Sequence, residues 1–130
     1  MKIDRRAVYE KAGGCCAYCG TSLEFKRMQV DHWWPQFLAH FERDKDNNRF
    51  ENLLPSCQKC NLHKHGMRPE VWRSELQRQV SMLKNNAQFD RALRFGQVEI
   101  VDKPIVFWFE RAAPQDNVEW PKTHLTTGQS

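Results

Sequence analysis

The chain has 130 residues, a length that fits one domain with one hydrophobic core. Its mean hydropathy is −0.77, and no apolar run approaches the roughly 18 to 20 residues that span a bilayer, so we expect a soluble protein without a membrane span. The formal net charge of +4 suits a polyanionic partner without identifying one. Residues 1–16 are charged and lack the apolar centre of a signal peptide, so we expect an intracellular, cytoplasmic protein with reduced cysteines.

A short helix is predicted near the start of the chain. Asp4 is a good N-cap for a helix over residues 5–12, and the glycines at 13–14 would end it because glycine is preferred at helix C-termini. Residues 25–34 then read as extended chain, with side chains alternating between two faces. A polar insertion over residues 40–50 separates this segment from the next.

A second strand and a second helix follow the insertion. Asn47 and Asn48 form a turn signal, and residues 51–55 are expected to form a short strand. A helix is expected over residues 57–65, ending at Gly66. Two strands followed by a helix indicate a small unit that mixes both kinds of element.

The C-terminal half reads as helices followed by a β-hairpin. Pro69 suits the first turn of a helix, and a further helix around Phe89 would end at Gly96. Residues 97–101 and 104–110 are rich in Val, Ile, Phe and Trp, which predicts a hairpin. The apolar residues with helical spacing after Pro69 are Trp72, Leu76, Val80 and Leu83.

Three parts of the chain follow from this pattern. Residues 1–66 are predicted to form the core with its N-terminal helix, and residues 67–111 a helical and hairpin extension packed on the same domain. Residues 112–130 are predicted to be a polar, flexible tail, unless Trp120 docks on the domain.

Four cysteines form two C-x-x-C pairs, Cys16 with Cys19 and Cys57 with Cys60. At this spacing two sulfurs of one turn can reach one ion at about 2.3 Å, and two such pairs complete a tetrahedral zinc site. Four thiolates saturate zinc, so the site would be structural. The alternative is a pair of redox motifs, but no thioredoxin-like βαβ pattern surrounds either pair. Cys15 is left over under both interpretations.

Asp31 and His32 are candidates for chemistry, because a carboxylate is a hard ligand for a divalent ion and an imidazole can act as a base near neutral pH. Asn61, directly after the last cysteine, offers a neutral amide oxygen, and Asn52 can bridge backbone groups and hold a loop. The alternative is a surface Asp, a hydrogen-bonded core His and two Asn in caps or turns. Neighbours in a strand face opposite ways, so Asp31 and His32 can share a site only where the strand bends or ends.

The combined pattern resembles the HNH (His-Asn-His) endonuclease family over residues 8–66. The resemblance implies a ββα-metal unit, in which a β-hairpin packs on a helix with the active site between them. The expected fold class is therefore α+β: an HNH ββα-metal core stapled by a four-Cys zinc site, with an N-terminal helix and a C-terminal helical and β-hairpin extension. The most specific matching pieces are residues 14–20, residues 30–32 with Pro35, residues 52–55, and residues 57–61 with Lys64.

The resemblance also assigns roles to the matched positions. His32 would be the general base that takes a proton from the attacking water, and Asp31 and Asn61 would hold one catalytic divalent ion. Asn52 would fix a loop and help to orient His32, and Lys64 would help to hold a substrate phosphate. The family often has His at the position of Asn61. The resemblance therefore does not decide between Mg²⁺, Mn²⁺ and Ni²⁺ as the catalytic ion. The alternative ligands close to Asn61 in the sequence are His63 and His65.

These roles predict a metal-dependent endonuclease of bacterial or phage-like type that hydrolyses DNA phosphodiester bonds, with RNA as an alternative substrate. One divalent ion and one histidine base suffice for that chemistry. The alternative functions are a non-catalytic zinc-knuckle module that binds nucleic acid and a small subunit of a larger nucleoprotein assembly. One active site cuts one strand, so a homodimer or a larger protein complex is a further expectation.

Three further groups could contact nucleic acid. Trp33 and Trp34 could stack on bases or pack in the core. The insertion at 40–50 could be a DNA-contacting loop or a solvated excursion. The basic residues of the C-terminal half could bind phosphates or form the solvated side of two amphipathic helices. These basic residues are Arg68, Arg73, Arg78, Lys84, Arg91 and Arg94.

Overall fold

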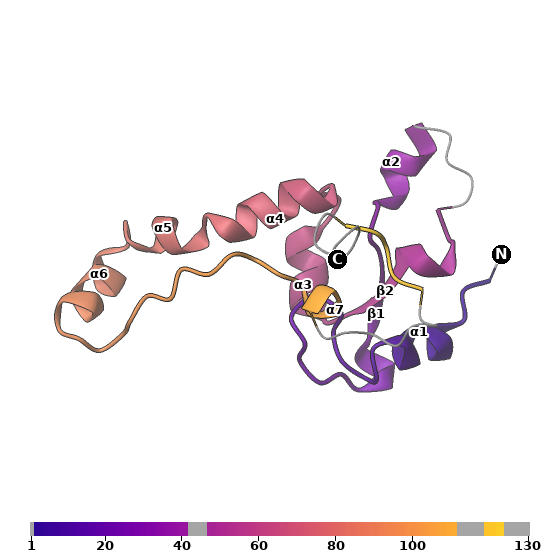
Figure 1. Cartoon of the computed structure of the whole chain (residues 1–130), viewed down its shortest axis with the longest axis horizontal. Helices are drawn as coiled ribbons and strands as arrows, with labels where there is room; N and C mark the ends of the chain where they lie inside the picture. The colour runs from indigo at the N-terminus through magenta and orange to yellow at the C-terminus, as the bar shows by residue number, and fades with distance from the viewer. Residues whose placement is uncertain (1, 42–46, 112–118, 124–130) are drawn as a thin grey trace. The chain divides into compact units, whose positions relative to one another are not determined.

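A computed structural model describes residues 2–41, 47–111 and 119–123 of the chain. The chain forms two compact units. The first unit comprises Met1–Pro69 and Val106–Ser130, and the second unit comprises Glu70–Ile105. No helix within the described ranges is long and apolar enough to cross a membrane. The elements of the first unit (Figure 1), where η marks a 3₁₀ helix, are α1 (Arg5–Lys11), η1 (Phe25–Arg27), β1 (Gln29–His32), α2 (Gln36–Phe41), η2 (Phe50–Asn52), β2 (Leu53–Ser56), α3 (Gln58–Lys64) and α7 (Trp108–Arg111).

The N-terminal helix α1 forms where the sequence predicts it. Asp4 caps the helix, and its Oδ1 accepts a hydrogen bond from the backbone N–H of Ala7 at 3.1 Å. Gly13 and Gly14 follow with φ values of 62° and 85°, which lie in the left-handed region that favours glycine. The helix therefore ends at the predicted glycine pair.

The two predicted strands form, but both are shorter than expected. β1 pairs antiparallel with β2, with His32 opposite Leu53. The 3₁₀ turn η1 takes up the start of the expected extended segment 25–34, and η2 takes up the start of the second expected strand. Each strand therefore has 4 residues, and β1 ends at His32, as a site shared by Asp31 and His32 requires.

α3 begins at the second cysteine pair and contacts β1. Cys57 is its N-cap, and the Cys57 sulfur accepts a hydrogen bond from the backbone N–H of Cys60 at 3.4 Å. The helix ends at its C-cap His65, which has a positive φ of 49°. A Cβ at Gly66 would lie 2.6 Å from the ring of Phe37, so glycine permits α2 to approach this corner.

The structure of residues 97–111 corrects one prediction. The β-hairpin expected over residues 97–101 and 104–110 is wrong, because no strand occurs over these described residues and α7 takes up the last part. Phe107 and Phe109 are 2% and 1% exposed and both pack edge-on against Trp33, at centroid distances of 5.6 and 5.3 Å. Burial in one aromatic cluster therefore replaces strand pairing, and Trp33 belongs to the core.

Backbone hydrogen bonds join α7 to the first cysteine pair. The N–H groups of Trp108 and Phe109 donate to the carbonyls of Tyr18 and Ala17, both at 2.9 Å. A hairpin partner strand is not needed to satisfy these donors, because the knuckle accepts them. The helix α7 thus holds the first cysteine pair in place through two backbone hydrogen bonds.

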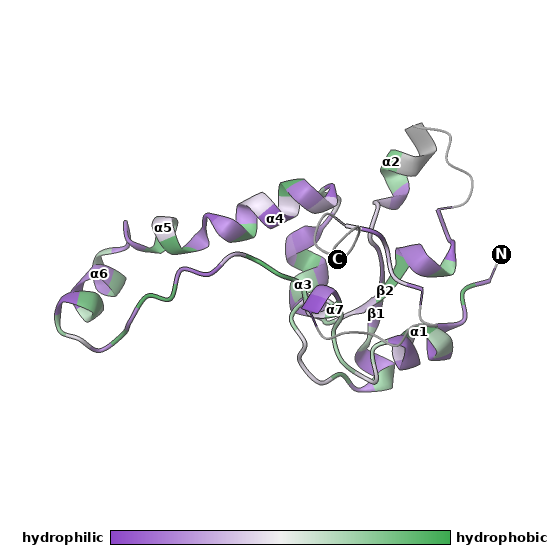
Figure 2. Ribbon diagram, viewed as in Figure 1, coloured by the Kyte–Doolittle hydropathy of each residue, from purple (hydrophilic) through white to green (hydrophobic). Residues whose placement is uncertain are grey.

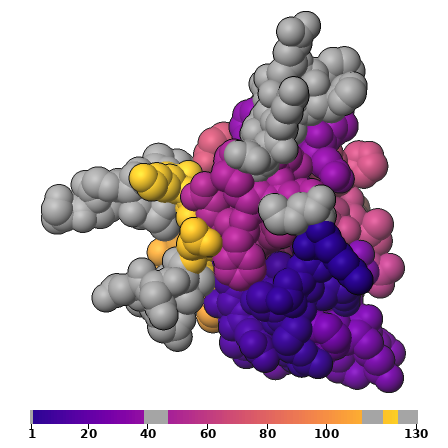
Figure 3. Space-filling view, turned by 90° about the vertical axis from the view of Figure 1, so that its right-hand side faces the viewer, coloured from indigo at the N-terminus to yellow at the C-terminus, as the bar shows by residue number. Residues whose placement is uncertain are grey.

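Trp120 docks on the first unit, as the sequence analysis allowed. Its ring stacks on Phe109 at a centroid distance of 5.3 Å, and the hydroxyl of Thr123 donates to Glu110 at 2.5 Å. In Figure 3 the short yellow segment 119–123 lies beside the magenta part of the chain. The remainder of the predicted tail lies outside the described residues, as do residues 42–46 of the polar insertion.

The second unit is helical. Its helices are α4 (Pro69–Gln77, whose first residue belongs to the first unit), α5 (Gln79–Leu83) and α6 (Ala87–Arg94). α4 begins at Pro69 as predicted, but the apolar stripe expected to form one helix breaks at Arg78. α6 ends before Gly96, which has a φ of 73°. Figure 2 shows hydrophobic and hydrophilic residues alternating along these helices.

Three of the basic residues considered as phosphate ligands form ion pairs within this unit. Arg73 contacts Glu70 at 2.9 Å and also donates to the carbonyl of Ile105. The other two pairs join residues one helical turn apart, as on the solvated side of a helix. They are Arg78 with Glu75 at 2.7 Å and Arg94 with Asp90 at 2.8 Å.

Candidate functional site

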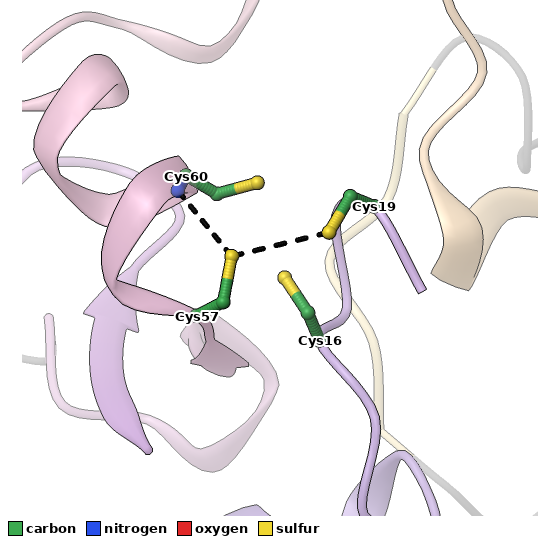
Figure 4. Close-up of side chains that lie close together, drawn as sticks. All are labelled: Cys16, Cys19, Cys57 and Cys60. Carbon is green, nitrogen blue, oxygen red and sulfur yellow. Dashed lines mark hydrogen bonds between the residues drawn. The ribbon is translucent and has the colours of Figure 1, made fainter. Parts of the chain in front are cut away.

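The four predicted cysteines come together at one point of the first unit. The Sγ atoms of Cys16, Cys19, Cys57 and Cys60 all lie within 4.8 Å of one another (Figure 4). Sulfurs bound tetrahedrally at about 2.3 Å would be roughly 3.8 Å apart. The sulfurs of Cys19 and Cys57 are 3.9 Å apart, so this pair already has the spacing of metal ligands rather than of a disulfide. The cluster can therefore hold a metal ion.

The pKa values of the cysteine thiols also favour metal binding by the cluster. A hydrogen bond from the neighbouring Cys60 thiol lowers the pKa of Cys16 to about 4, and that contact raises the pKa of Cys60. The Cys16 sulfur also accepts a hydrogen bond from the backbone N–H of Tyr18 at 3.4 Å. A thiolate is thus stabilised inside the cluster, and thiolates are the form that binds metal ions. Cys15 is outside the cluster, in a β-bridge with Ser22.

Asp31 lies in β1 with its carboxylate nearly buried. Its Oδ2 accepts a short hydrogen bond from the hydroxyl of Tyr18 and lies 3.1 Å from the Nζ of Lys64. Its Oδ1 has no hydrogen-bond partner within the described part of the chain. Two donors therefore fix one oxygen of the Asp31 carboxylate, and neither of these donors contacts the other oxygen.

Lys64 is the last residue of α3, and its side chain is 0% exposed. Its ammonium also donates to the carbonyl of His32 at 2.9 Å. Burial lowers the pKa of Lys64, and the charge of Asp31 opposes that shift. The ammonium therefore faces Asp31 and the end of β1 rather than the solvent.

His32 lies beside a cleft of about 560 Å³. Asp31 and His32 line this cleft together with residues 35–37 and 65–67. The Nε2 atom of His32 lies 2.7 Å from the Oδ1 atom of Asn48. The end of β1 thus brings the two adjacent residues to one cleft, and Asn48 fixes the orientation of the imidazole.

Asn52 is 5% exposed and connects two segments next to His32. Its Oδ1 accepts a hydrogen bond from the N–H of Trp34 at 2.8 Å, and its Nδ2 donates to the carbonyl of Asn47 at 2.8 Å. These bonds join the chain after β1 to the turn that carries Asn48. The side chain of Asn52 thus holds the loop around His32.

Asn61 lies on α3, one helical turn before His65. Its N–H donates to the carbonyl of Cys57 at 3.0 Å, and its side chain is not among the groups that line the cleft. His65 does line the cleft. The structure thus brings together Asp31, His32 and His65 around the cleft, with Asn61 in the last turns of α3 before its C-cap His65.

Sequence reasoning missed two residues of this site, Tyr18 and Asn48. The only sequence signal for Tyr18 is its place between two cysteines, and the only one for Asn48 is its place in a turn. Neither signal reveals a side-chain partner, because only the fold brings Tyr18 to Asp31 and Asn48 to His32.

Comparison with known proteins gives a family for this region. Residues 16–66 match the family model of the HNH endonuclease. The chain is 36% identical over 70 residues to the CRISPR-associated endonuclease Cas9 of Actinomyces naeslundii, covering 54% of this chain and 6% of that protein. It is 24% identical over 110 residues to the CRISPR-associated endonuclease Cas9 of Corynebacterium diphtheriae, covering 80% of this chain and 10% of that protein.

A solved structure is also similar. It is the crystal structure of the Type II-C Cas9 enzyme from Actinomyces naeslundii, with a TM-score of 0.46 and 32% identity, covering 55% of this chain and 7% of that chain. The chain thus spans a tenth or less of the length of the relatives it matches. Residues 16–66, which contain the paired strands, the helix that follows them and the cysteine cluster, therefore form a domain of the HNH endonuclease family.

Proposed function

We propose that the first unit is a metal-dependent endonuclease that hydrolyses DNA phosphodiester bonds. The observation that carries the proposal is that Asp31 and His32 line one cleft, with Asp31 held by Lys64 and His32 held by Asn48. The family match over residues 16–66 supports the reaction class. The net charge of +4 suits a polyanionic substrate.

His32 is the general base in this proposal. Its Nε2 lies 2.7 Å from the carboxamide oxygen of Asn48, and because that oxygen only accepts hydrogen bonds, Nε2 carries the imidazole proton. Nδ1 is then left to take a proton from water as the water oxygen attacks phosphorus. The bond between phosphorus and O3′ breaks, and the leaving oxygen takes a proton from solvent.

Asp31, which lines the cleft, and Asn61, one turn of α3 before the cleft-lining His65, are the proposed ligands of the catalytic divalent ion, with His65 as the alternative to Asn61. The donor set fits Mg²⁺, with Mn²⁺ and Ni²⁺ as alternatives, since it combines a carboxylate oxygen that lacks a hydrogen-bond partner among the described residues with a neutral amide oxygen. An ion bound there would supply Lewis-acid stabilisation of the charge on the phosphate. Asn52 keeps the loop around His32 in place.

Lys64 is proposed to position Asp31 instead of holding a substrate phosphate. Its buried ammonium contacts Asp31 and the carbonyl of His32, so it fixes both ends of the Asp31–His32 pair. Zinc is the proposed ion of the cysteine cluster, because four thiolates make a closed site of the kind that zinc occupies in structural sites.

The relatives suggest a setting for this activity. Both matched curated relatives are named as CRISPR-associated endonucleases, and the chain spans 6% and 10% of their lengths. We propose DNA as the substrate of the cleft, either for this chain as a homodimer or within a larger nucleoprotein assembly.

Nicking of supercoiled plasmid DNA in Mg²⁺, Mn²⁺ or Ni²⁺ tests the proposal. The His32→Ala variant should lose roughly 10²- to 10⁴-fold in rate while its circular dichroism and cysteine-bound metal stay unchanged. Cleavage that is equal in wild type and His32→Ala would overturn the proposal. DNA that is bound but never cut by the wild type would favour the non-catalytic nucleic-acid-binding module instead.

A further inference from the structure

We propose that Tyr18 is a positioning residue for Asp31, so that the first cysteine pair determines the geometry of the carboxylate in the cleft. The proposal rests on the proposed function, in which Asp31 is a ligand of the catalytic ion. In this proposal the side chain of Tyr18 connects the cysteine cluster to the cleft.

The backbone of Tyr18 belongs to the cysteine knuckle. Tyr18 lies between Cys16 and Cys19, and its N–H donates to the sulfur of Cys16 at 3.4 Å. Its carbonyl accepts a hydrogen bond from the N–H of Trp108 at 2.9 Å. The main chain of this residue is therefore fixed on one side by a proposed metal ligand and on the other side by α7.

The ring of Tyr18 is fixed as well. It is stacked on Trp33 at a centroid distance of 6.2 Å with an interplanar angle of 26°, and it meets Phe107 edge-on at 5.5 Å. The residue is only 3% exposed. With backbone and ring both held, the hydroxyl has little freedom to leave the position from which it donates to Asp31.

The contact to Asp31 has the chemistry of a partner that orients a metal ligand. A neutral phenol is a hydrogen-bond donor, and it shares Oδ2 of Asp31 with the ammonium of Lys64. Carboxylates that bind metal ions are commonly held in this way through one oxygen, and loss of such a partner typically costs about 10- to 100-fold in metal affinity or activity. Tyr18 and Lys64 thus fix the rotation of the carboxylate through Oδ2, while Oδ1 has no hydrogen-bond partner among the described residues.

The Tyr18→Phe variant tests this role, because it removes the hydroxyl and keeps the ring in its aromatic surroundings. Tyr9→Phe is the matched control, since the hydroxyl of Tyr9 donates to the carbonyl of Leu23 at 2.7 Å, away from Asp31. Mn²⁺ binding is titrated by electron paramagnetic resonance on full-length protein that retains its cysteine-bound metal. Asp31→Asn defines the part of the binding that depends on the carboxylate.

The expected result is Asp31-dependent Mn²⁺ binding that is about tenfold weaker in Tyr18→Phe than in wild type and unchanged in Tyr9→Phe. Content of the cysteine-bound metal should be equal in all variants, and the melting temperature of Tyr18→Phe should stay close to that of Tyr9→Phe. Equal Mn²⁺ binding in Tyr18→Phe and wild type would overturn this inference alone. A wild type whose Mn²⁺ binding does not depend on Asp31 would overturn the proposed function, and the inference with it.

Discussion

The ammonium of Lys64 lies 3.1 Å from Oδ2 of Asp31, and the two side chains are 0% and 10% exposed. The pair joins the end of α3 to β1, because Lys64 also donates to the carbonyl of His32. Removal of one member of a buried pair of opposite charges leaves the other charge buried without its partner, which costs about 3 to 5 kcal/mol. The same contact therefore bears on the stability of the first unit and on the geometry of the cleft.

Replacing Lys64 by methionine should lower the free energy of unfolding by about 3 kcal/mol, because the carboxylate of Asp31 is left buried without its cation. Urea unfolding measures the loss, and the double variant Lys64→Met, Asp31→Asn should regain part of it. In the nicking assay kcat should fall while KM for DNA stays within about twofold, since the ammonium does not face solvent. A large rise in KM with unchanged stability would instead support the phosphate-binding role of Lys64.

Removing one ligand of the cysteine cluster should unfold the first unit. A structural zinc ion contributes on the order of 10 kcal/mol to folding in small domains. Cys57→Ser should therefore lose bound zinc, measured by mass spectrometry, and its cooperative thermal transition. Cys15→Ser is the matched control, because Cys15 is outside the cluster and should keep both properties. Zinc-free Cys57→Ser protein with wild-type stability would refute the structural role.

Truncating Asn48 should slow cleavage without unfolding the protein. The carboxamide of Asn48 holds Nε2 of His32 at 2.7 Å, so Asn48→Ala leaves the imidazole free to rotate and to change tautomer. We expect a loss of about 10- to 100-fold in kcat. Asn85→Ala, at an exposed position of the second unit, is the matched truncation and should cut at the wild-type rate. Equal rates for Asn48→Ala and Asn85→Ala would remove Asn48 from the site.

Local signals predicted the elements that surround the site. The cap at Asp4, the glycines at 13 and 14 and the C-x-x-C spacing depend on neighbours in the sequence, and the structure confirms α1 and the cysteine cluster. The strands were predicted in place but too long, because the 3₁₀ turns η1 and η2 take up the first residues of both predicted segments. Local sequence patterns thus predict the position of a helix or strand better than its first and last residues.

Contacts between distant segments could not be predicted in this way. The spacing of Phe107 and Phe109 also fits a strand, and only the position of Trp33 in the folded chain makes burial of both rings in one cluster the better solution. From the sequence, Lys64 is a basic residue on a predicted helix. The sequence does not indicate that its side chain is buried and donates to the carbonyl of His32 in β1. The partners of Asp31 and His32 were missed because Tyr18 and Asn48 meet them only in the folded structure.

Phe109→Ala should cost about 3 to 5 kcal/mol of unfolding free energy, because it empties a fully buried site between Trp33 and Trp120. Phe95→Ala is the matched control, since Phe95 is 78% exposed and its loss should change stability by less than about 0.5 kcal/mol. Chemical denaturation of both variants measures the difference. Similar small losses for the two would show that the C-terminal segment does not belong to the core.

Lys11 should make the stability of the first unit depend on pH. Its Nζ donates to the carbonyls of Phe50 and Leu53 at 2.6 and 2.8 Å. Burial lowers the pKa of Lys11 from 10.5 to about 7, although the nearby carboxylates of Glu119 and Glu51 oppose the shift. Between these two values the unfolded chain binds a proton that the folded chain does not, so the free energy of unfolding rises with pH.

The slope of that rise is the quantity to measure. Lys11 should contribute about 1 kcal/mol per pH unit above pH 7, and its contribution should level off near the unfolded pKa of 10.5. Urea unfolding at several pH values should therefore show a flatter profile in Lys11→Met than in wild type, with the cysteine-bound metal retained in both. The variant is also expected to be less stable overall, because two backbone carbonyls lose their donor, so only the difference in slope counts. Parallel profiles would mean that Lys11 keeps its proton throughout this range.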